Sequence, residues 1–154
     1  MPSKTRRVML VGVVALTLTV ALAPGPADAG TLRVRLLELI NRTRQHHDLH
    51  ALRTNARLSD DAEGHTRKMI RRGKLFDPTN LREVLRPYPW KLGASVVGCA
   101  GTLGRIVQLW MHSKVHRDIL LNPRLRRAGV GVIPTEGNTS CGRDAIWATS
   151  LIYG

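Results

Sequence analysis

The N-terminal segment constrains this chain most, because it decides which residues fold at all. Lys4, Arg6 and Arg7 precede an uncharged, apolar run over residues 8–23, and the small residues Ala-Asp-Ala follow at 27–29. A basic region, an apolar run and a small-residue triplet in this order are typical of a secretory signal peptide. The sequence therefore predicts a signal peptide over residues 1–29 and a secreted domain over residues 30–154.

The same apolar run is short for a membrane anchor. A membrane-spanning helix needs about 20 predominantly apolar residues, and Gly12, Thr17 and Thr19 make this run less apolar still. We expect no transmembrane anchor after cleavage, with a retained anchor as the alternative interpretation.

Residues 30–154 suffice for one hydrophobic core and are too few for two. The chain contains 24 Lys and Arg against 11 Asp and Glu, which gives a formal net charge of +13. Such a charge attracts polyanions over long range, whether nucleic acid, anionic lipid headgroups or an acidic wall polymer. The basic residues are spread along the chain, so an arginine-rich, solvated surface is the simpler explanation. We expect a monomer without a specific nucleic-acid partner.

The chain has two cysteines, Cys99 and Cys141, and both lie in the segment predicted to be exported. Two cysteines in an oxidising compartment usually pair. Neither has neighbours at zinc-ligand spacing, so a disulfide is predicted, with free or metal-binding thiols as the alternative.

The folded segment alternates helical periodicity with short apolar runs. Helices are predicted at residues 32–46, 59–73 and 103–113, followed by a short helical segment at 113–120. Strands are predicted at residues 95–99, 129–133 and 145–153. The prolines of residues 77–92 indicate an irregular loop with at most one helical turn. Helices beside a small, mostly antiparallel sheet make an α+β domain.

Local signals place two of the helix starts. Asp60 and Glu63 have the spacing of a capping box, which predicts that the second helix begins at residue 59 or 60. Ser113 interrupts the third helix, and its hydroxyl is positioned to cap the short segment that follows.

Motifs from residue 37 onward form an ordered series: Leu37-x-x-Ile40-Asn41-x-x-Arg44, Trp110-Met111-x-Ser113-x-x-His116, Asn122-Pro123 and Gly129-Val130-Gly131-Val132. This series resembles the CAP superfamily of cysteine-rich secretory proteins, antigen 5 and pathogenesis-related 1 proteins, in the form of a bacterial SCP-like domain. The resemblance implies an α-β-α sandwich, in which three or four helices flank a small, mostly antiparallel sheet with a central cleft.

In many members of that superfamily, two histidines and two acidic residues of the cleft bind a divalent metal. The resemblance maps these four positions onto Asp77, Ala94, Ser113 and His116, so that only the last retains its family residue. The implied metal site is therefore degenerate. We expect no cofactor, and His116 and Asp77 are the remaining candidates for a metal ligand.

The candidate cleft residues are His116, Asp77, His65 and Ser113. His65 lies on an apolar helix face, where a histidine satisfied within the core is the alternative reading. A backbone carbonyl could likewise satisfy His116. Acid–base or nucleophilic catalysis needs a partnered titratable group, and Ala94 removes the obvious partner, so no catalytic residue is assigned.

Three functions remain open. The first is a non-catalytic binding module that acts outside the cell or at its envelope, with a lipid or an anionic envelope component as its partner. The second is a metal-dependent hydrolase with a site rebuilt from His65, Asp77, His112 and His116. The third is a cationic effector that coats polyanions.

The signal-peptide assignment predicts the N-terminus of the exported protein. Mass spectrometry of the secreted chain should find Gly30, or a residue close to it, at the N-terminus. A full-length product retained in the membrane would contradict the assignment.

Overall fold

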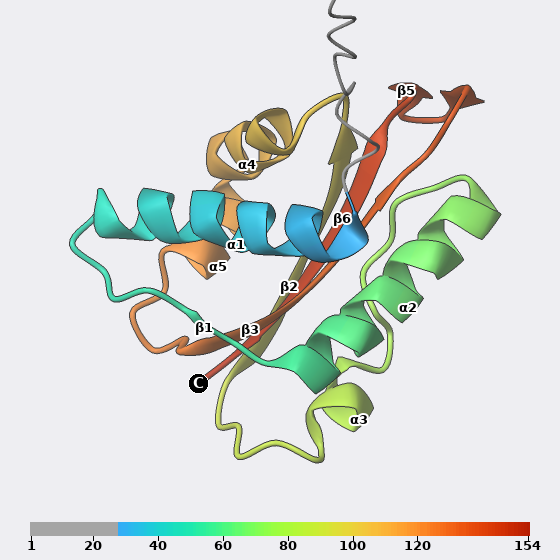
Figure 1. Ribbon diagram of the computed structural model, residues 1–154. Coiled ribbons are helices and arrows are strands. Elements are labelled where there is room, and N and C mark those ends of the chain that lie inside the picture. Colours follow the sequence, from blue (N-terminus) through green and yellow to red (C-terminus); the bar gives the residue numbers. More distant parts are fainter. Residues whose placement is uncertain (1–27) are drawn as a thin grey trace, which may run out of the picture.

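The computed structural model describes residues 28–154 (Figure 1). The predicted signal peptide lies outside the described residues except for residues 28–29, at which α1 (Ala29–Gln45) begins. Among the helices of the described segment, none is both long and apolar enough to span a membrane.

The domain is built in three layers around a four-stranded sheet, as Figure 1 shows. The strands are β1 (Arg53–Thr54), β2 (Gly93–Ala100), β3 (Arg127–Pro134) and β6 (Ile146–Tyr153). They lie in the order β1-β3-β6-β2; β1 is parallel to β3, and the other neighbours are antiparallel. β4 (Asn138–Thr139) and β5 (Gly142–Arg143) form a separate two-stranded hairpin.

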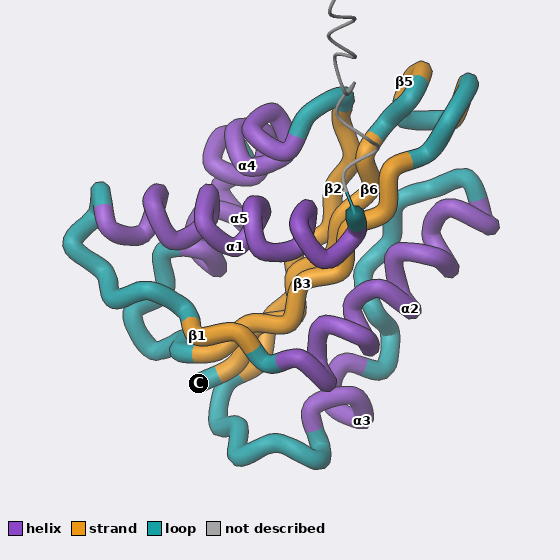
Figure 2. The backbone as a smooth tube through the Cα atoms, in the orientation of Figure 1, coloured by secondary structure: helices purple, strands orange, loops and turns teal. Residues whose placement is uncertain are grey.

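Helices cover both faces of this sheet. α1, α4 (Leu103–His112) and α5 (Lys114–Leu120) lie on one face, and α2 (Ala56–Arg72) and α3 (Leu81–Leu85) lie on the other (Figures 1 and 2). The larger core packs between α1, α4 and the sheet, and two smaller clusters lie beneath α2 and α3. The expected mostly antiparallel α-β-α sandwich is therefore confirmed, with α3 as the single turn predicted in the proline-rich loop.

The predicted capping box at the start of α2 is wrong. The helix begins at Ala56 because the side chain of Asn55 accepts a hydrogen bond from the amide of Leu58 at 3.1 Å. An asparagine is among the preferred residues at this position. Asp60 and Glu63 lie within the helix, where they form ion pairs with Arg33 of α1.

Two glycines of β3 bring the backbone of α2 directly onto the sheet. A Cβ atom at Gly131 would lie 2.2 Å from the backbone nitrogen of Glu63, and one at Gly129 would lie 2.3 Å from the carbonyl carbon of Leu58. Glycine in a strand interior marks such a close backbone approach. The family-like Gly-Val-Gly-Val run is thus explained by helix–sheet packing.

Two links involve β2: Trp110 joins it to α4, and the disulfide joins it to the β4–β5 hairpin. The indole of Trp110 is buried and donates a hydrogen bond to the carbonyl of Val97 at 2.8 Å. Cys99, at the end of β2, is bonded to Cys141 in the β4–β5 hairpin, as predicted. Closing a loop with a sequence separation of 42 residues stabilises the fold by about 4 kcal/mol in the chain-entropy model.

A buried arginine joins α1 to the segment between α5 and β3. Arg44 is fully buried, and its Nε donates to the carbonyl of His50 at 3.0 Å. Its Nη1 donates to the carbonyls of Leu120 at 2.6 Å and Asn122 at 3.1 Å, and its Nη2 donates to that of Leu125 at 3.3 Å. The guanidinium therefore fixes the backbone that leads from α5 into β3.

The close approach of α2 to β3 generates a prediction. Gly131→Ala should lower the free energy of unfolding by about 3 kcal/mol, because a rigid backbone must move to admit the new methyl group. Gly104→Ala is the matched control, since nothing lies within 4 Å of its added Cβ and alanine favours a helix by about 1 kcal/mol. Equal denaturation midpoints for Gly131→Ala and the wild type would contradict this packing.

Candidate functional site

The candidate site is a cavity of about 490 Å³ at the outer edge of β2. β2 is an edge strand that pairs with β6 alone. Its first residues, 93–95, form one wall, α5 forms another, and Asp77 from the loop after α2 closes one end. The cavity thus lies at an edge of the sheet, whereas the resemblance implied a central cleft, but it contains three of the four positions that the resemblance assigned to that cleft, Asp77, Ala94 and His116.

The lining of this cavity combines apolar and polar side chains. The apolar lining includes Leu92, Ile119 and Leu125. The polar lining consists of Asp77, Ser95, His116, Asp118 and Asn122. A mostly apolar cavity with a few convergent polar groups is typical of a small-molecule site.

Ser113 sets the position of His116. It ends α4 and precedes α5, and its extended backbone, with φ −89° and ψ 120°, separates the two helices. The predicted capping contact is wrong, because the Ser113 hydroxyl makes no capping hydrogen bond to α5. The break nevertheless turns the chain, so that His116 in the first turn of α5 lines the cavity.

His116 is half-buried and lines two adjacent cavities. The second, of about 230 Å³, is more apolar and is lined among others by Leu75, Leu109, Trp110 and Ser113. None of the side-chain hydrogen bonds of α4 and α5 in the described segment involves the imidazole of His116, so no backbone carbonyl there satisfies this histidine. Its ring nitrogens are available to a ligand.

The two carboxylates of the cavity have different partners. Asp77 accepts a hydrogen bond from the hydroxyl of Ser95 at 3.0 Å through Oδ1. Asp118 forms an exposed ion pair with Lys114, one turn earlier on α5, at 2.6 Å. Of the two, Asp77 therefore brings to the cavity a negative charge that none of the ion pairs among residues 28–154 compensates.

Two of the predicted histidines lie outside this cavity. His65 is buried on α2, with Nε2 2.7 Å from the carbonyl oxygen of Phe76 and its ring edge-on to the Phe76 ring. It is a core histidine, which was the alternative reading. His112 is exposed, and its Nδ1 lies 2.7 Å from the carbonyl oxygen of Gln108 in its own helix. Of the predicted candidates, only Asp77 and His116 share this cavity.

The residues of the site do not fit the metal that the resemblance implies. Within the described segment, no three His, Cys, Asp or Glu side chains lie close enough together to hold a metal ion. Ala94 lines the cavity at the position where the family has a carboxylate. A closed zinc shell needs three or four ligands, and of the four family positions only His116 keeps its residue.

Sequence reasoning missed Ser95, Asp118 and Asn122 as parts of the site. Ser95 directly follows Ala94, a position that the resemblance assigned to the cleft, and this closeness in sequence could have identified it. Asp118 and Asn122 reach the cavity because of how α5 lies against β2, which no local pattern encodes.

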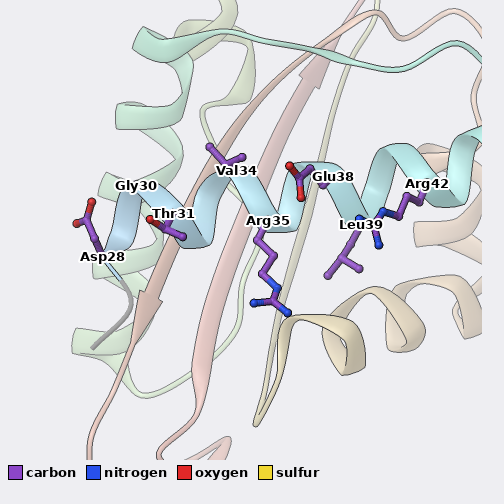
Figure 3. Close-up of a pocket in the computed structure, with 8 residues that line it drawn as sticks. All are labelled: Asp28, Gly30, Thr31, Val34, Arg35, Glu38, Leu39 and Arg42. Atoms are coloured by element: carbon purple, nitrogen blue, oxygen red, sulfur yellow. The ribbon is translucent and has the colours of Figure 1, made fainter. Parts of the chain in front are cut away.

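Another pocket, of about 650 Å³, lies on the outer surface of α1 (Figure 3). Its lining begins at Asp28, the first described residue, and includes Arg35, Glu38 and Arg42. As Figure 3 shows, these side chains are spaced along the helix and point in different directions rather than toward one point. The surface therefore offers less convergent chemistry than the cavity at His116.

Comparisons with known proteins agree with this architecture. The sequence profile of the cysteine-rich secretory protein family, called CAP, matches residues 37–151. An outer surface protein from Borrelia burgdorferi has a similar structure, with a TM-score of 0.68 and 18% identity over 82% of this chain and 96% of the other. No curated protein sequence matches this chain.

Two longer proteins also contain a similar domain. One is an extracellular protein with an SCP domain from Bacillus anthracis, with a TM-score of 0.62 and 21% identity over 85% of this chain and 45% of that one. The other is a cysteine-rich secretory protein from Staphylococcus aureus, with a TM-score of 0.63 and 23% identity over 80% and 39% of the two chains. This chain thus spans less than half the length of either protein, and identities this low show a shared fold.

Returning the missing ligands to the cavity should restore metal binding. The double variant Asp77→His/Ala94→Glu should bind zinc at least about tenfold more tightly than the wild type in calorimetry, because both positions line the cavity beside His116. Adding His116→Ala to that variant is the control and should remove the gain. An unchanged zinc affinity in the double variant would show that these three positions do not converge.

Proposed function

Since this chain belongs to the cysteine-rich secretory protein family, or CAP family, we propose that it is a non-catalytic module that binds a ligand outside the cell. The cavity lined by His116 and Asp77 would be its binding site. The predicted signal peptide and the similarity to a protein described as extracellular support this location.

One observation carries the proposal. A cavity of about 490 Å³ contains a half-buried histidine whose ring makes no hydrogen bond within the described segment. Small-molecule sites have volumes of roughly 300–1,000 Å³ and orient their ligands with a few polar groups. An unpartnered imidazole beside apolar lining residues supplies such a group.

The arrangement of the polar groups supports binding rather than catalysis. General acid–base catalysis needs a positioned group whose partner orients it or takes its proton. Asp77 is hydrogen-bonded to Ser95, Asp118 is paired with Lys114, and within the described segment neither carboxylate forms a hydrogen bond or ion pair with His116. The rebuilt-hydrolase alternative needs a cluster of metal ligands, and residues 28–154 contain no such cluster.

The lining favours an uncharged, hydroxyl-bearing amphipathic ligand, such as a lipid component of the cell envelope. Asp77, whose charge no ion pair of the described residues compensates, would repel an anionic head group, whereas hydroxyl groups can donate to the carboxylates and to His116. Leu92, Ile119 and Leu125 offer apolar surface to the hydrocarbon part.

A matched pair of probes tests this function. By calorimetry, 1-monooctanoylglycerol should bind the wild-type protein, and octanoate, which carries a carboxylate in place of the glycerol ester, should bind at least about tenfold more weakly. His116→Ala should weaken binding of the monoglyceride about tenfold, since it removes one buried hydrogen bond worth about 1 to 1.5 kcal/mol. His112→Ala is the control and should leave binding unchanged, because that exposed ring bonds its own helix.

Three results would contradict the proposal. Octanoate binding as tightly as the monoglyceride would refute the role of the carboxylates, and equal losses in the two histidine variants would refute the location. Hydrolysis of the monoglyceride that depends on His116 would favour the hydrolase instead.

A further inference from the structure

A further cavity, of about 580 Å³, lies at the opposite edge of the sheet, beside β1. It is lined by His50, Ala51, Arg53, Arg126 and Arg127. We refer to it as the arginine pocket. Figure 2 shows β1 running beside the start of β3, which brings these residues together from separate parts of the chain. Three of the five residues carry a guanidinium, and none is acidic.

Two of these arginines are neighbours across the strand pair. Arg53 and Arg127 are in register in the parallel β1–β3 ladder, so their side chains leave the same face of the sheet. Like charges at paired positions destabilise a sheet. The five ion pairs of residues 28–154 involve neither of them, nor Arg126. Their charges are therefore uncompensated by the protein.

The third arginine is held in place by a histidine. The Nε2 atom of His50 lies 2.8 Å from the carbonyl oxygen of Leu125, to which it donates. Its Nδ1 is then an acceptor and receives a hydrogen bond from Nη1 of Arg126. His50 thus orients the guanidinium of Arg126 at the pocket before any ligand arrives.

The buried Arg44 adds positive charge behind the pocket. Burial, and after it the positive charge of Arg126, lowers the pKa of Arg44. The effect of Arg126 on this pKa reflects the repulsion between the guanidinium groups of Arg44 and Arg126.

We propose that the arginine pocket binds the oxyanion of a phosphate group. Guanidinium groups bind phosphate through paired, charge-assisted hydrogen bonds. An oxyanion between Arg53, Arg126 and Arg127 would compensate charges that the protein leaves unpaired. This site is separate from the cavity at His116.

Binding of inorganic phosphate, measured by calorimetry at constant ionic strength, tests the site. Arg53→Gln/Arg127→Gln should raise the Kd for phosphate at least about tenfold. Arg71→Gln/Arg82→Gln is the matched control: it removes the same charge from two exposed arginines that make no ion pair, and it should change the Kd less than twofold. Equal losses in both variants, or no phosphate binding by the wild type, would overturn the proposal.

Arg53→Glu separates loss of the site from loss of the fold. A carboxylate opposite Arg127 should abolish phosphate binding and, without phosphate, raise the melting temperature by relieving the repulsion. A lower melting temperature, or phosphate binding that persists, would contradict the arrangement of the two arginines.

Vesicles identify the source of the phosphate group. Phosphatidylglycerol vesicles that bind the control variant but not Arg53→Gln/Arg127→Gln would support a lipid headgroup. If Arg53→Gln/Arg127→Gln loses inorganic phosphate binding while both variants still bind the vesicles, the result would support a soluble or polymer-borne phosphate. Vesicle binding lost equally in both variants, with phosphate affinity unchanged in both, would overturn the site.

Discussion

A buried guanidinium without a carboxylate partner connects the parts of this domain that carry both candidate sites. Removing a charge from water costs several kcal/mol, so Arg44 is tolerated because backbone carbonyls accept its hydrogen bonds. Those carbonyls belong to His50 and to residues 120–125. Asn122 and Leu125 line the cavity at His116, while His50 and the adjacent Arg126 line the arginine pocket. One side chain thus holds the walls of both.

The elements defined by local patterns were predictable from the sequence. The apolar face that includes Trp110 predicted α4, and the Gly-Val-Gly-Val run predicted β3. The start of α2 was not predictable in this way, because both Asn55 and Asp60 are suitable capping residues. The structure uses Asn55, whose side chain accepts a hydrogen bond from the amide of Leu58. Glu63 lies within the helix and pairs with Arg33 of α1 instead of forming a capping box.

The candidate site was predictable only in part, for a similar reason. The resemblance led to His116 and Asp77, and the structure places both in one cavity. His65 was included because of its sequence position alone, and its contact with Phe76 shows that it serves the core. Asp118 and Asn122 were missed because their place in the cavity depends on how Ser113 redirects the chain.

The fold does not depend on the metal that the family resemblance implies. The contact of α2 with Gly129 and Gly131, the Trp110 hydrogen bond and the disulfide use none of the four positions that the resemblance assigns to a metal. The cleft can therefore lose metal ligands while the scaffold persists. What remains is a cavity with apolar lining residues and an available imidazole, which suits binding of a small molecule.

The most direct test of this account is a nitrogen-15 NMR titration of residues 30–154 with 1-monooctanoylglycerol. The account predicts that the largest amide shifts fall on residues 92–95 and 115–122, which form the walls of the cavity at His116. The amides of residues 35–42, beside the pocket of Figure 3, should move little. Shifts concentrated on α1, or spread evenly over the domain, would contradict a binding site at the edge of β2.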